Sequence, residues 1–343
     1  MKAFVKYGTA PYEAAIQKTC DPEHGDHDVI LAVAGCGICG SDLHAYRADV
    51  GYEWVRIPVI LGHEFAGTVI STGSAVTKYQ KGDRVVVVGI QGCGICHRCR
   101  AGNTNLCDNR KVIGLDMDGG MAQYAAVHED YLIPVPDTID LKMAALVEPF
   151  SVAAHAMSKT VIYPEQRVVV TGPGPIGLFC GIIAGLSGAK VLIVGTESDT
   201  YRRLPVARKL GLRTVNIEQE SLDESMKTAF EGDRPDLWVE ASGSPQAFKS
   251  SIEQVRRGGC IVIVGMYSQS FEWLPTVAVR AGYSIYFSYA SASRDYRFAL
   301  QLMAGNAFPL DPLVDFFPME KAHEAFKEAE KGMTVKPVLI TGE

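Results

Sequence analysis

Four cysteines lie close together in the chain, in the run GCGICHRCRAGNTNLC. Their spacing, C-x2-C-x2-C-x7-C, is typical of a tetrahedral zinc site made of four thiolates. Such a site leaves no coordination position for water or substrate, so its role is structural. The sequence therefore predicts a structural zinc ion and an open, catalytic site elsewhere. The four expected ligands of the structural zinc are Cys93, Cys96, Cys99 and Cys107.

A glycine-rich turn follows the apolar run RVVVT and begins a helical pattern. In this strand–turn–helix context, G-x-G-x-x-G is the fingerprint of a dinucleotide-binding βαβ unit. Gly172 permits the tight turn, Gly174 lets the backbone approach a pyrophosphate, and Gly177 lets helix and strand pack closely. The unpaired N–H groups of the helix N-terminus attract the phosphates. The residues expected at the cofactor are Gly172, Gly174, Pro175, Ile176 and Gly177.

The end of the second strand of this unit bears on the choice between NAD and NADP. An acidic residue there would bind the adenosine ribose hydroxyls of NAD, but the sequence has Gly195. Without a carboxylate a 2′-phosphate is not repelled, and nearby hydroxyl and guanidinium groups can bind it. The sequence therefore favours NADP over NAD; alternatively, Glu197 or Asp199 turns inward and restores a preference for NAD. The expected phosphate contacts are Thr196, Arg202 and Arg203.

Three further segments carry side chains that zinc can bind, and they read CGICGSDLH from Cys36, GHEFAG from Gly62 and VEP from Val147. Each segment alone is a weak signal, because buried cysteines, structural histidines and acids before proline are common. Together with the cysteine run and the glycine turn, in this order, they resemble the zinc-dependent medium-chain alcohol/polyol dehydrogenase family. The resemblance covers essentially the whole chain and is greatest to the sorbitol (L-iditol) and threonine dehydrogenase branches.

The resemblance implies an α/β fold in which a GroES-like irregular β catalytic domain joins a doubly wound Rossmann domain. It also implies a second, catalytic zinc ion. Cys39 and His63 would bind this zinc, Glu64 would be a third ligand or a close neighbour, and Glu148 would be a ligand that exchanges with water. Exchange keeps a position open for the substrate oxygen, which zinc polarises before a hydride passes to the nicotinamide.

The resemblance further implies a path for the substrate's proton. Ser41, two residues after Cys39, matches the family's relay hydroxyl, and His44 matches the histidine that passes the proton to solvent. Alternatively, His44 is a solvated surface histidine. Asp42 either orients a zinc-binding histidine or caps a helix, and Cys36 is expected to be a small buried residue.

Two stretches bear on the substrate. Residues 45–57, AYRADVGYEWVRI, are rich in aromatic and charged side chains, which either line a substrate pocket or pack against the domain. Polyol dehydrogenases of this branch often carry an arginine where this chain reads Phe287-Ser288-Tyr289-Ala290. The missing arginine argues against sorbitol as the substrate and leaves a different polyol, a vicinal diol and a simpler secondary alcohol open.

The order of the elements indicates two domains. The first 150 residues contain short strand patterns separated by Gly, Asp and Pro. From about Glu165, strands and helices alternate, which predicts a parallel, doubly wound sheet. The closing run VKPVLITG is expected to rejoin the first domain. We therefore expect a catalytic domain of residues 1–152 and 291–343, and a Rossmann domain of residues 153–290.

Composition argues against several other classes of protein. The net charge of −6 is spread over 343 residues without a basic block, so nucleic acid is not an expected partner. The apolar runs are too short to span a membrane, and MKAFVKYGTA lacks the apolar core of a secretion signal. Nine cysteines, an odd number, favour metal-bound or free thiols in a reducing compartment, so a cytoplasmic protein is expected.

We therefore expect an enzyme that transfers a hydride between a polyol or secondary alcohol and NAD(P), with two zinc ions per chain. A threonine- or butanediol-type dehydrogenase of the same fold is the alternative. A zinc-free reductase of the superfamily would lack the cysteine run and the zinc ligands. A non-enzymatic zinc-binding or redox-sensing protein would not need the glycine turn. The resemblance also implies a homotetramer or dimer, with residues 261–290 as the contact.

Overall fold

The chain forms two compact units in a computed structural model that describes residues 1–342. The first unit comprises Met1–Ser151, Ser291–Asn306 and Val314–Glu343, and the second comprises Val152–Ala290 and Ala307–Leu313. The C-terminal part of the chain thus contributes to both units. Within the described residues, no helix combines the length and the apolar character needed to cross a membrane.

The first unit is built mainly of antiparallel strands. The larger sheet has the order β10-β6-β5-β3-β18-β17, with β9 also paired to β3, and the smaller has the order β2-β1-β4. The strands are β1 Lys2–Lys6, β2 Ala14–Lys18, β3 Asp28–Gly37, β4 Val59–Ile60, β5 Glu64–Thr72, β6 Arg84–Val87, β7 Ile90–Gln91, β8 Lys111–Val112, β9 Tyr124–His128, β10 Leu132–Pro134, β17 Val314–Pro318 and β18 Lys336–Ile340. Strand β18, the closing run of the sequence, pairs with the end of β3, where Val338 lies opposite Gly37.

The helices of the first unit are short. They are α1 Gly40–Arg47, α2 His97–Arg100, α9 Ser293–Ala304 and α10 Ala322–Glu330, and helix α3 Val147–Met157 begins in the first unit and ends in the second. Helix α1 starts directly after β3 because Asp42 Oδ2 accepts the backbone N–H of Cys39 at 2.9 Å, closing the first turn. It ends where Ala48 adopts the left-handed conformation. The chain also contains 3₁₀ turns at Thr104–Leu106, Glu129–Tyr131, Met143–Leu146, Glu197–Asp199, Asp311–Leu313 and Met319–Lys321.

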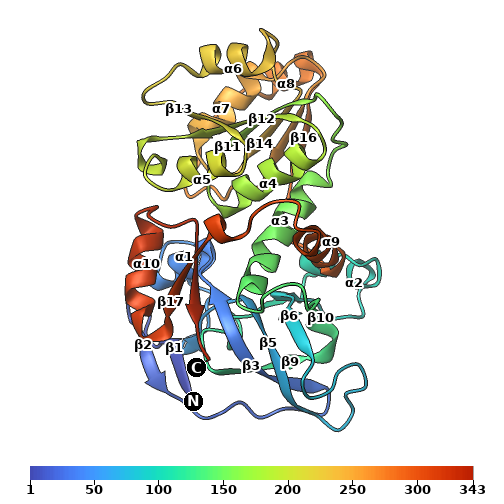
Figure 1. The fold of residues 1–343 in the computed structure, drawn as a ribbon, viewed down its shortest axis with the longest axis vertical. Coiled ribbons are helices and arrows are strands. Elements are labelled where there is room, and N and C mark those ends of the chain that lie inside the picture. The colour runs from blue at the N-terminus through green and yellow to red at the C-terminus, as the bar shows by residue number, and fades with distance from the viewer. Residues whose placement is uncertain (343) are drawn as a thin grey trace. The chain divides into compact units, whose positions relative to one another are not determined.

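The second unit is a parallel sheet with the strand order β13-β12-β11-β14-β15-β16. Its helices cover both faces, with α4 and α5 on one and α6 and α7 on the other (Figure 1). The elements are β11 Arg167–Thr171, α4 Pro175–Leu186, β12 Lys190–Gly195, α5 Arg203–Lys209, β13 Arg213–Asn216, α6 Leu222–Phe230, β14 Leu237–Glu240, α7 Pro245–Gln254, β15 Cys260–Ile263, α8 Pro275–Ala281 and β16 Ser284–Phe287. This is the doubly wound order of a Rossmann domain, so the expected fold class is confirmed.

Buried charge fixes the amino-terminal ends of the central strands of this sheet. The carboxylate of Asp236, just before β14, accepts from Arg167 Nε at 2.8 Å and Nη2 at 2.9 Å, and from Arg256. Burial opposes the charged form of Asp236, but the two arginines outweigh it and hold the pKa of that carboxyl well below its usual range. The group therefore stabilises the unit at pH values above the ordinary carboxyl range, and this contribution is lost as the pH falls below about 4.

We predict that Asp236→Asn lowers the free energy of unfolding of the second unit by about 3 kcal/mol at pH 7, because two arginines lose a buried partner. Urea unfolding followed by tryptophan fluorescence measures this. Asp233→Asn is the matched control, because Asp233 also contacts Arg167 but its side chain is 71% exposed, and it should cost less than about 1 kcal/mol. Equal losses in the two variants would contradict the assignment.

Candidate active site

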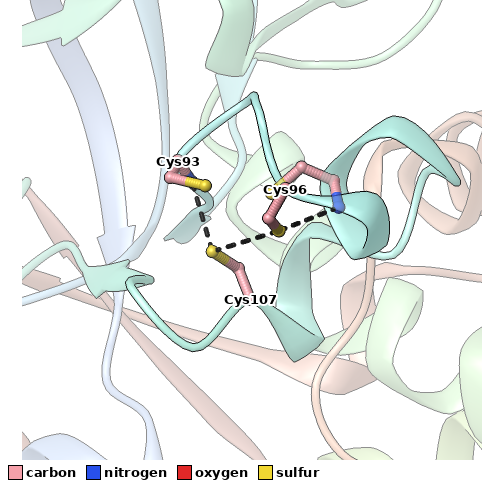
Figure 2. Close-up of side chains that lie close together, drawn as sticks. Cys93, Cys96 and Cys107 are labelled. Carbon is pink, nitrogen blue, oxygen red and sulfur yellow. Dashed lines mark hydrogen bonds between the residues drawn. The ribbon is translucent and has the colours of Figure 1, made fainter.

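The four cysteines of the spaced run gather in the loop between β7 and β8. Their sulfur atoms all lie within 4.8 Å of one another, and Cys93, Cys96 and Cys107 point toward a common centre (Figure 2). The backbone N–H of Cys93 donates to Cys107 Sγ at 3.3 Å, and that of Cys99 to Cys96 Sγ at 3.4 Å. The loop thus presents four thiol groups as one donor set, which matches the tetrathiolate site expected from the spacing.

Charge in this loop favours a bound cation. Backbone N–H groups of Ile95 and Cys96 lower the pKa of Cys93 to about 6. Burial, with the neighbouring Cys96 thiol, raises the pKa of Cys99 to about 12. A loop that stabilises one thiolate resists a second, because like charges this close repel. A zinc ion would remove that repulsion, and the residues present fit one.

A second group of possible ligands lies where β3 ends and β5 begins. Ligand atoms of Cys39, His63 and Glu64 all lie within 4.8 Å of one another. Cys39 precedes α1, whereas His63 and Glu64 stand at the start of β5, which pairs with β3 through Gly37 and Glu64. The strand pairing therefore brings two segments of the sequence into one donor set. Cys36 is buried beside this group but is not part of it.

Lys336, at the start of β18, holds Glu64 in place. Its Nζ lies 2.6 Å from Glu64 Oε1 and 2.7 Å from Oε2, and also donates to the carbonyl oxygen of Ile38 at 2.9 Å. Both side chains are almost fully buried, with relative exposures of 4% and 1%. Burial opposes the charged lysine, but Glu64 outweighs it and raises the pKa of Lys336. Glu64 is thus anchored as a carboxylate beside Cys39 and His63.

Glu148, in the first turn of α3, is the remaining expected ligand and is also buried. Burial raises the pKa of Glu148 to about 7, an effect that His63 opposes and the Glu64 carboxylate reinforces. It is not among the three residues whose ligand atoms cluster within 4.8 Å. The structure therefore places Glu148 within electrostatic reach of His63 but outside the tight donor set.

Of the two roles that the sequence left open for Asp42, the structure shows the helix cap. It caps α1, and its Oδ1 accepts the backbone N–H of Gly62 at 3.2 Å. The same oxygen is 3.9 Å from Nδ1 of His63, which is buried without a hydrogen-bond partner. Burial opposes the charged form of His63, but the Cys39 sulfur and Asp42 outweigh it and raise its pKa well above the ordinary value. Asp42 thus faces His63, at a distance longer than a hydrogen bond.

These residues together fit a zinc ion. Asp42, Glu64 and Glu148 are buried carboxyl groups near the Cys39 thiol, and Lys336 and His63, whose pKa values are both raised, are the cationic groups among them. Burial raises the pKa of Asp42 and of Glu148, so these two groups ionise fully only beside a further positive charge. A divalent cation would supply that charge, and sulfur, imidazole and carboxylate are the donors that zinc takes.

The two residues expected to relay the proton lie on α1. Ser41 and His44 are three residues apart, so they share one face of the helix. His44 Nδ1 is 2.7 Å from Asp49 Oδ2, and the His44 ring stacks on Tyr52 with 4.9 Å between centroids. His44 is therefore held by two neighbours and is not a freely solvated surface histidine.

Three side chains of residues 45–57 make hydrogen bonds or ion pairs within the first unit. The Tyr46 hydroxyl hydrogen-bonds His323 Nδ1 at 2.8 Å, and Arg56 pairs with Asp118. The Trp54 indole donates to the carbonyl oxygen of Gly51. The packing interpretation of residues 45–57 is therefore supported for Tyr46, which is buried, but not for Trp54 or Arg56, which are 49% and 48% exposed.

A cavity of about 300 Å³ lies at the carboxyl ends of the central strands of the second unit. Gly172 has φ +89°, and a Cβ on Gly177 would lie 1.9 Å from the Gly172 carbonyl oxygen, so neither position accepts a side chain. A Cβ on Gly174 would meet no atom within 4 Å, which leaves open space in front of this turn. Pro175, Ile176 and Gly177 form the first turn of α4, whose N-cap is Gly174. The turn can thus seat a pyrophosphate at the helix N-terminus.

The rim of this cavity at the end of β12 carries hydroxyl groups and one arginine. Thr196, Ser198, Asp199 and Arg203 line it, whereas Arg202 is not among the lining residues. Asp199 accepts the Thr196 backbone N–H at 3.0 Å and pairs with Arg203 Nη1 at 3.3 Å.

The carboxylate of Glu197, the other acid near the end of β12, bonds to side chains outside the cavity. Glu197 accepts from Asn216 Nδ2 at 2.8 Å and from Gln219 Nε2 at 2.6 Å. Of the two acids that could restore an NAD preference, Glu197 is therefore committed outside the cavity and Asp199 is paired with Arg203.

Sequence reasoning missed two residues that border the catalytic cluster. Lys336 lies in an apolar strand, where a lysine is unusual, and this was the available signal. Tyr296 of α9 is fully buried, and its hydroxyl accepts the backbone N–H of Gly89 at 3.0 Å. Gly89 in turn packs on His63, because a Cβ there would lie 3.2 Å from His63 Cβ. No local pattern marks Tyr296, because its partners are distant in the sequence.

Two family models match the chain. The alcohol dehydrogenase GroES-like domain matches residues 25–137, and the zinc-binding dehydrogenase domain matches residues 175–305. The chain is 34% identical to the sorbitol dehydrogenase of Halalkalibacterium halodurans over 351 aligned positions, covering 99% of both chains. It is 32% identical to the L-threonine 3-dehydrogenase of Saccharopolyspora erythraea, covering 99% of this chain and 98% of that protein.

The chain is also similar to dehydrogenases of known structure. The crystal structure of a zinc-binding dehydrogenase from Sinorhizobium meliloti 1021 bound to NADP superposes with a TM-score of 0.90 at 27% identity. The match covers 99% of this chain and 98% of that one. With the two zinc-type donor sets and the glycine-rich turn in place, the chain belongs to the zinc-dependent medium-chain alcohol/polyol dehydrogenase family.

Proposed function

We propose that this dehydrogenase oxidises a polyol or secondary alcohol to the ketone and reduces NADP. The observation that carries the proposal is the buried group of Cys39, His63 and Glu64, with Glu64 held by Lys336. Because Lys336 occupies both oxygens of Glu64, we assign Cys39 and His63 as fixed zinc ligands and Glu148 as the exchangeable one. Glu64 then lies beside the zinc without having to bind it.

Each residue around this site has a separate task. When bound, zinc would polarise the substrate hydroxyl and make its proton easier to remove, and the nicotinamide would accept the hydride. Asp42 fixes the start of α1 and faces His63. Ser41 and His44 carry the hydroxyl proton from the substrate toward solvent. The structural zinc would fasten the loop at Cys93–Cys107, which has little core of its own.

NADP is the proposed cofactor because of the rim at the end of β12. Arg203 offers a guanidinium group to a 2′-phosphate, and Thr196 and Ser198 offer hydroxyl groups. Asp199 is the one acid among the lining residues, and its charge is shared with Arg203 and the Thr196 N–H. We also propose a reducing compartment such as the cytoplasm, because all nine cysteines are free thiols, as zinc binding requires.

The zinc assignment predicts that Cys39→Ser or His63→Ala removes one of two zinc ions and lowers kcat by at least a thousandfold, about 4 kcal/mol. NADP should still bind with a near-normal Kd, because its cavity lies wholly in the second unit. Elemental analysis, kinetics and nucleotide titration measure these effects. Near-normal turnover in either variant would contradict the assignment.

Cys93→Ser is the matched control, because it changes a cysteine of the other donor set. It should also remove one zinc ion, but its first effect should be a lower Tm and not lost chemistry. If elemental analysis found only one zinc ion per chain in the unmodified protein, the proposal of a second, catalytic zinc would be wrong.

The cofactor assignment predicts that Arg203→Ala lowers kcat/KM for NADP by ten- to a hundredfold, about 1.5–3 kcal/mol, the usual worth of a hydrogen bond to a charged group. The value for NAD should change less than about twofold. Arg202→Ala is the control, because Arg202 does not line the cavity. A panel of polyols, diols and secondary alcohols with both cofactors measures this, and a strong preference of the unmodified enzyme for NAD would refute it.

We further propose that the enzyme is a homo-oligomer joined through the edge strand β16. This strand pairs with β15 on one side only within the described sheet. Exposed apolar side chains cover it and the adjoining α8 region, and they are Leu274, Val277, Val279, Tyr286, Phe287 and Tyr289. An unpaired edge beside a large apolar surface is a ready site for a second strand.

Phe287→Lys should convert the oligomer to monomers, because it places a charge at the centre of this surface. Light scattering coupled to gel filtration measures the mass. Val161→Lys is the control, because Val161 is equally exposed in the second unit but lies outside β16 and α8. If the molar mass of Phe287→Lys equalled that of the unmodified protein, the proposed interface at β16 would be wrong.

A further inference from the structure

The His44 imidazole is held on one edge and one face. On the edge, its Nδ1 lies 2.7 Å from Oδ2 of Asp49. On the face, the Tyr52 ring stacks with an interplanar angle of 23°. Asp49 and Tyr52 both belong to the turn that follows α1, so this turn fixes the orientation of the ring.

Asp49 acts on His44 as an ionised carboxylate. The same oxygen, Oδ2, accepts from Arg47 Nε at 3.0 Å and from Nη2 at 2.7 Å. The Arg47 guanidinium holds the pKa of Asp49 below its usual value. Arg47 is in turn 3.6 Å from Glu330 of α10. Lys6 and Glu53 are further charged residues nearby, since they line a cavity together with Asp49 and Tyr52.

An ionised carboxylate can only accept a hydrogen bond, so Nδ1 of His44 must donate. A neutral imidazole carries one N–H, and placing it on Nδ1 leaves Nε2 with its lone pair free to take up a proton. Arg47 Nη2 also lies 3.3 Å from Nδ1, but Nδ1 cannot accept from it while donating to Asp49.

We propose that Asp49 is a positioning residue for proton release, which fixes the Nδ1–H tautomer of His44 and stabilises the imidazolium while it carries the proton. The proposal rests on the relay role of His44 given above. The substrate proton passes through Ser41 Oγ to Nε2, the imidazolium holds it beside the Asp49 carboxylate, and water then takes it. No electrons move in this step.

The test compares pH profiles of kcat/KM for alcohol oxidation. Asp49→Asn should lower the rate at pH 7 by about tenfold, within the range that a positioned base contributes, because the amide is uncharged and can flip to select the other tautomer. The acid limb of the profile should also move to lower pH, because the imidazolium loses its neighbouring negative charge.

Matched variants separate this role from a structural one. Glu53→Gln removes a nearby exposed carboxylate that accepts the Gly51 N–H, and it should change neither rate nor profile. Asp49→Glu should restore part of the rate, and Tm values show whether each variant is folded. A slower Asp49→Asn enzyme with an unmoved acid limb would overturn the proposal.

A second readout does not depend on turnover. Long-range ¹H–¹⁵N NMR of the enzyme distinguishes the two tautomers, and loss of a signal in His44→Gln assigns it. The unmodified protein should show the Nδ1–H form and Asp49→Asn a mixture. An Nε2–H signal from His44 would overturn the positioning role alone, whereas full activity in His44→Gln would overturn the relay on which it rests.

Discussion

The buried ion pair between Lys336 and Glu64 is the interaction on which the catalytic group depends. Lys336 binds both carboxylate oxygens and also the carbonyl oxygen of Ile38, one residue before Cys39. One ammonium group therefore joins the segment that carries Cys39 to the segment that carries His63 and Glu64. Losing one partner of such a pair costs about 3–5 kcal/mol, because it leaves the other charge buried and unpaired. The position of β18 in the first unit is thus a requirement of the site as well as of the sheet.

The Lys336–Glu64 pair also limits how many of the buried acids near Cys39 can be ionised without a further cation. Lys336 offsets one carboxylate, while Asp42 and Glu148 remain near the Cys39 thiol. Burial raises the pKa of Asp42 and of Glu148, so without a further cation these groups shift toward their neutral forms. A divalent ion bound among these groups would favour their ionised forms and would itself be attracted by them.

The sequence predicted those contacts whose partners are close together along the chain, and it missed those whose partners are far apart. The thiols of Cys93 and Cys107 and the turn at Gly172 were predictable because short spacings in the chain determine those geometries. Lys336 and Glu64 are 272 residues apart, and strand pairing brings them together, so residue types alone could not reveal the pair. Asp49 lies between these cases, because it is close to His44 but belongs to no motif. The sequence patterns therefore did not show which charged side chains pair with one another at the site.

Gly195 has a second explanation that the sequence did not contain. From the sequence, a glycine at the end of β12 means a missing carboxylate and hence room for a 2′-phosphate. In the structure a Cβ at this position would lie 2.9 Å from Leu204 Cδ2, 3.0 Å from Pro173 Cγ and 3.1 Å from Asp199 Oδ2. A side chain here would crowd these three neighbours, so packing favours a small residue whichever cofactor binds. The proposed choice of NADP therefore rests less on Gly195 than on Asp199 and Arg203, which pair with each other and line the same cavity.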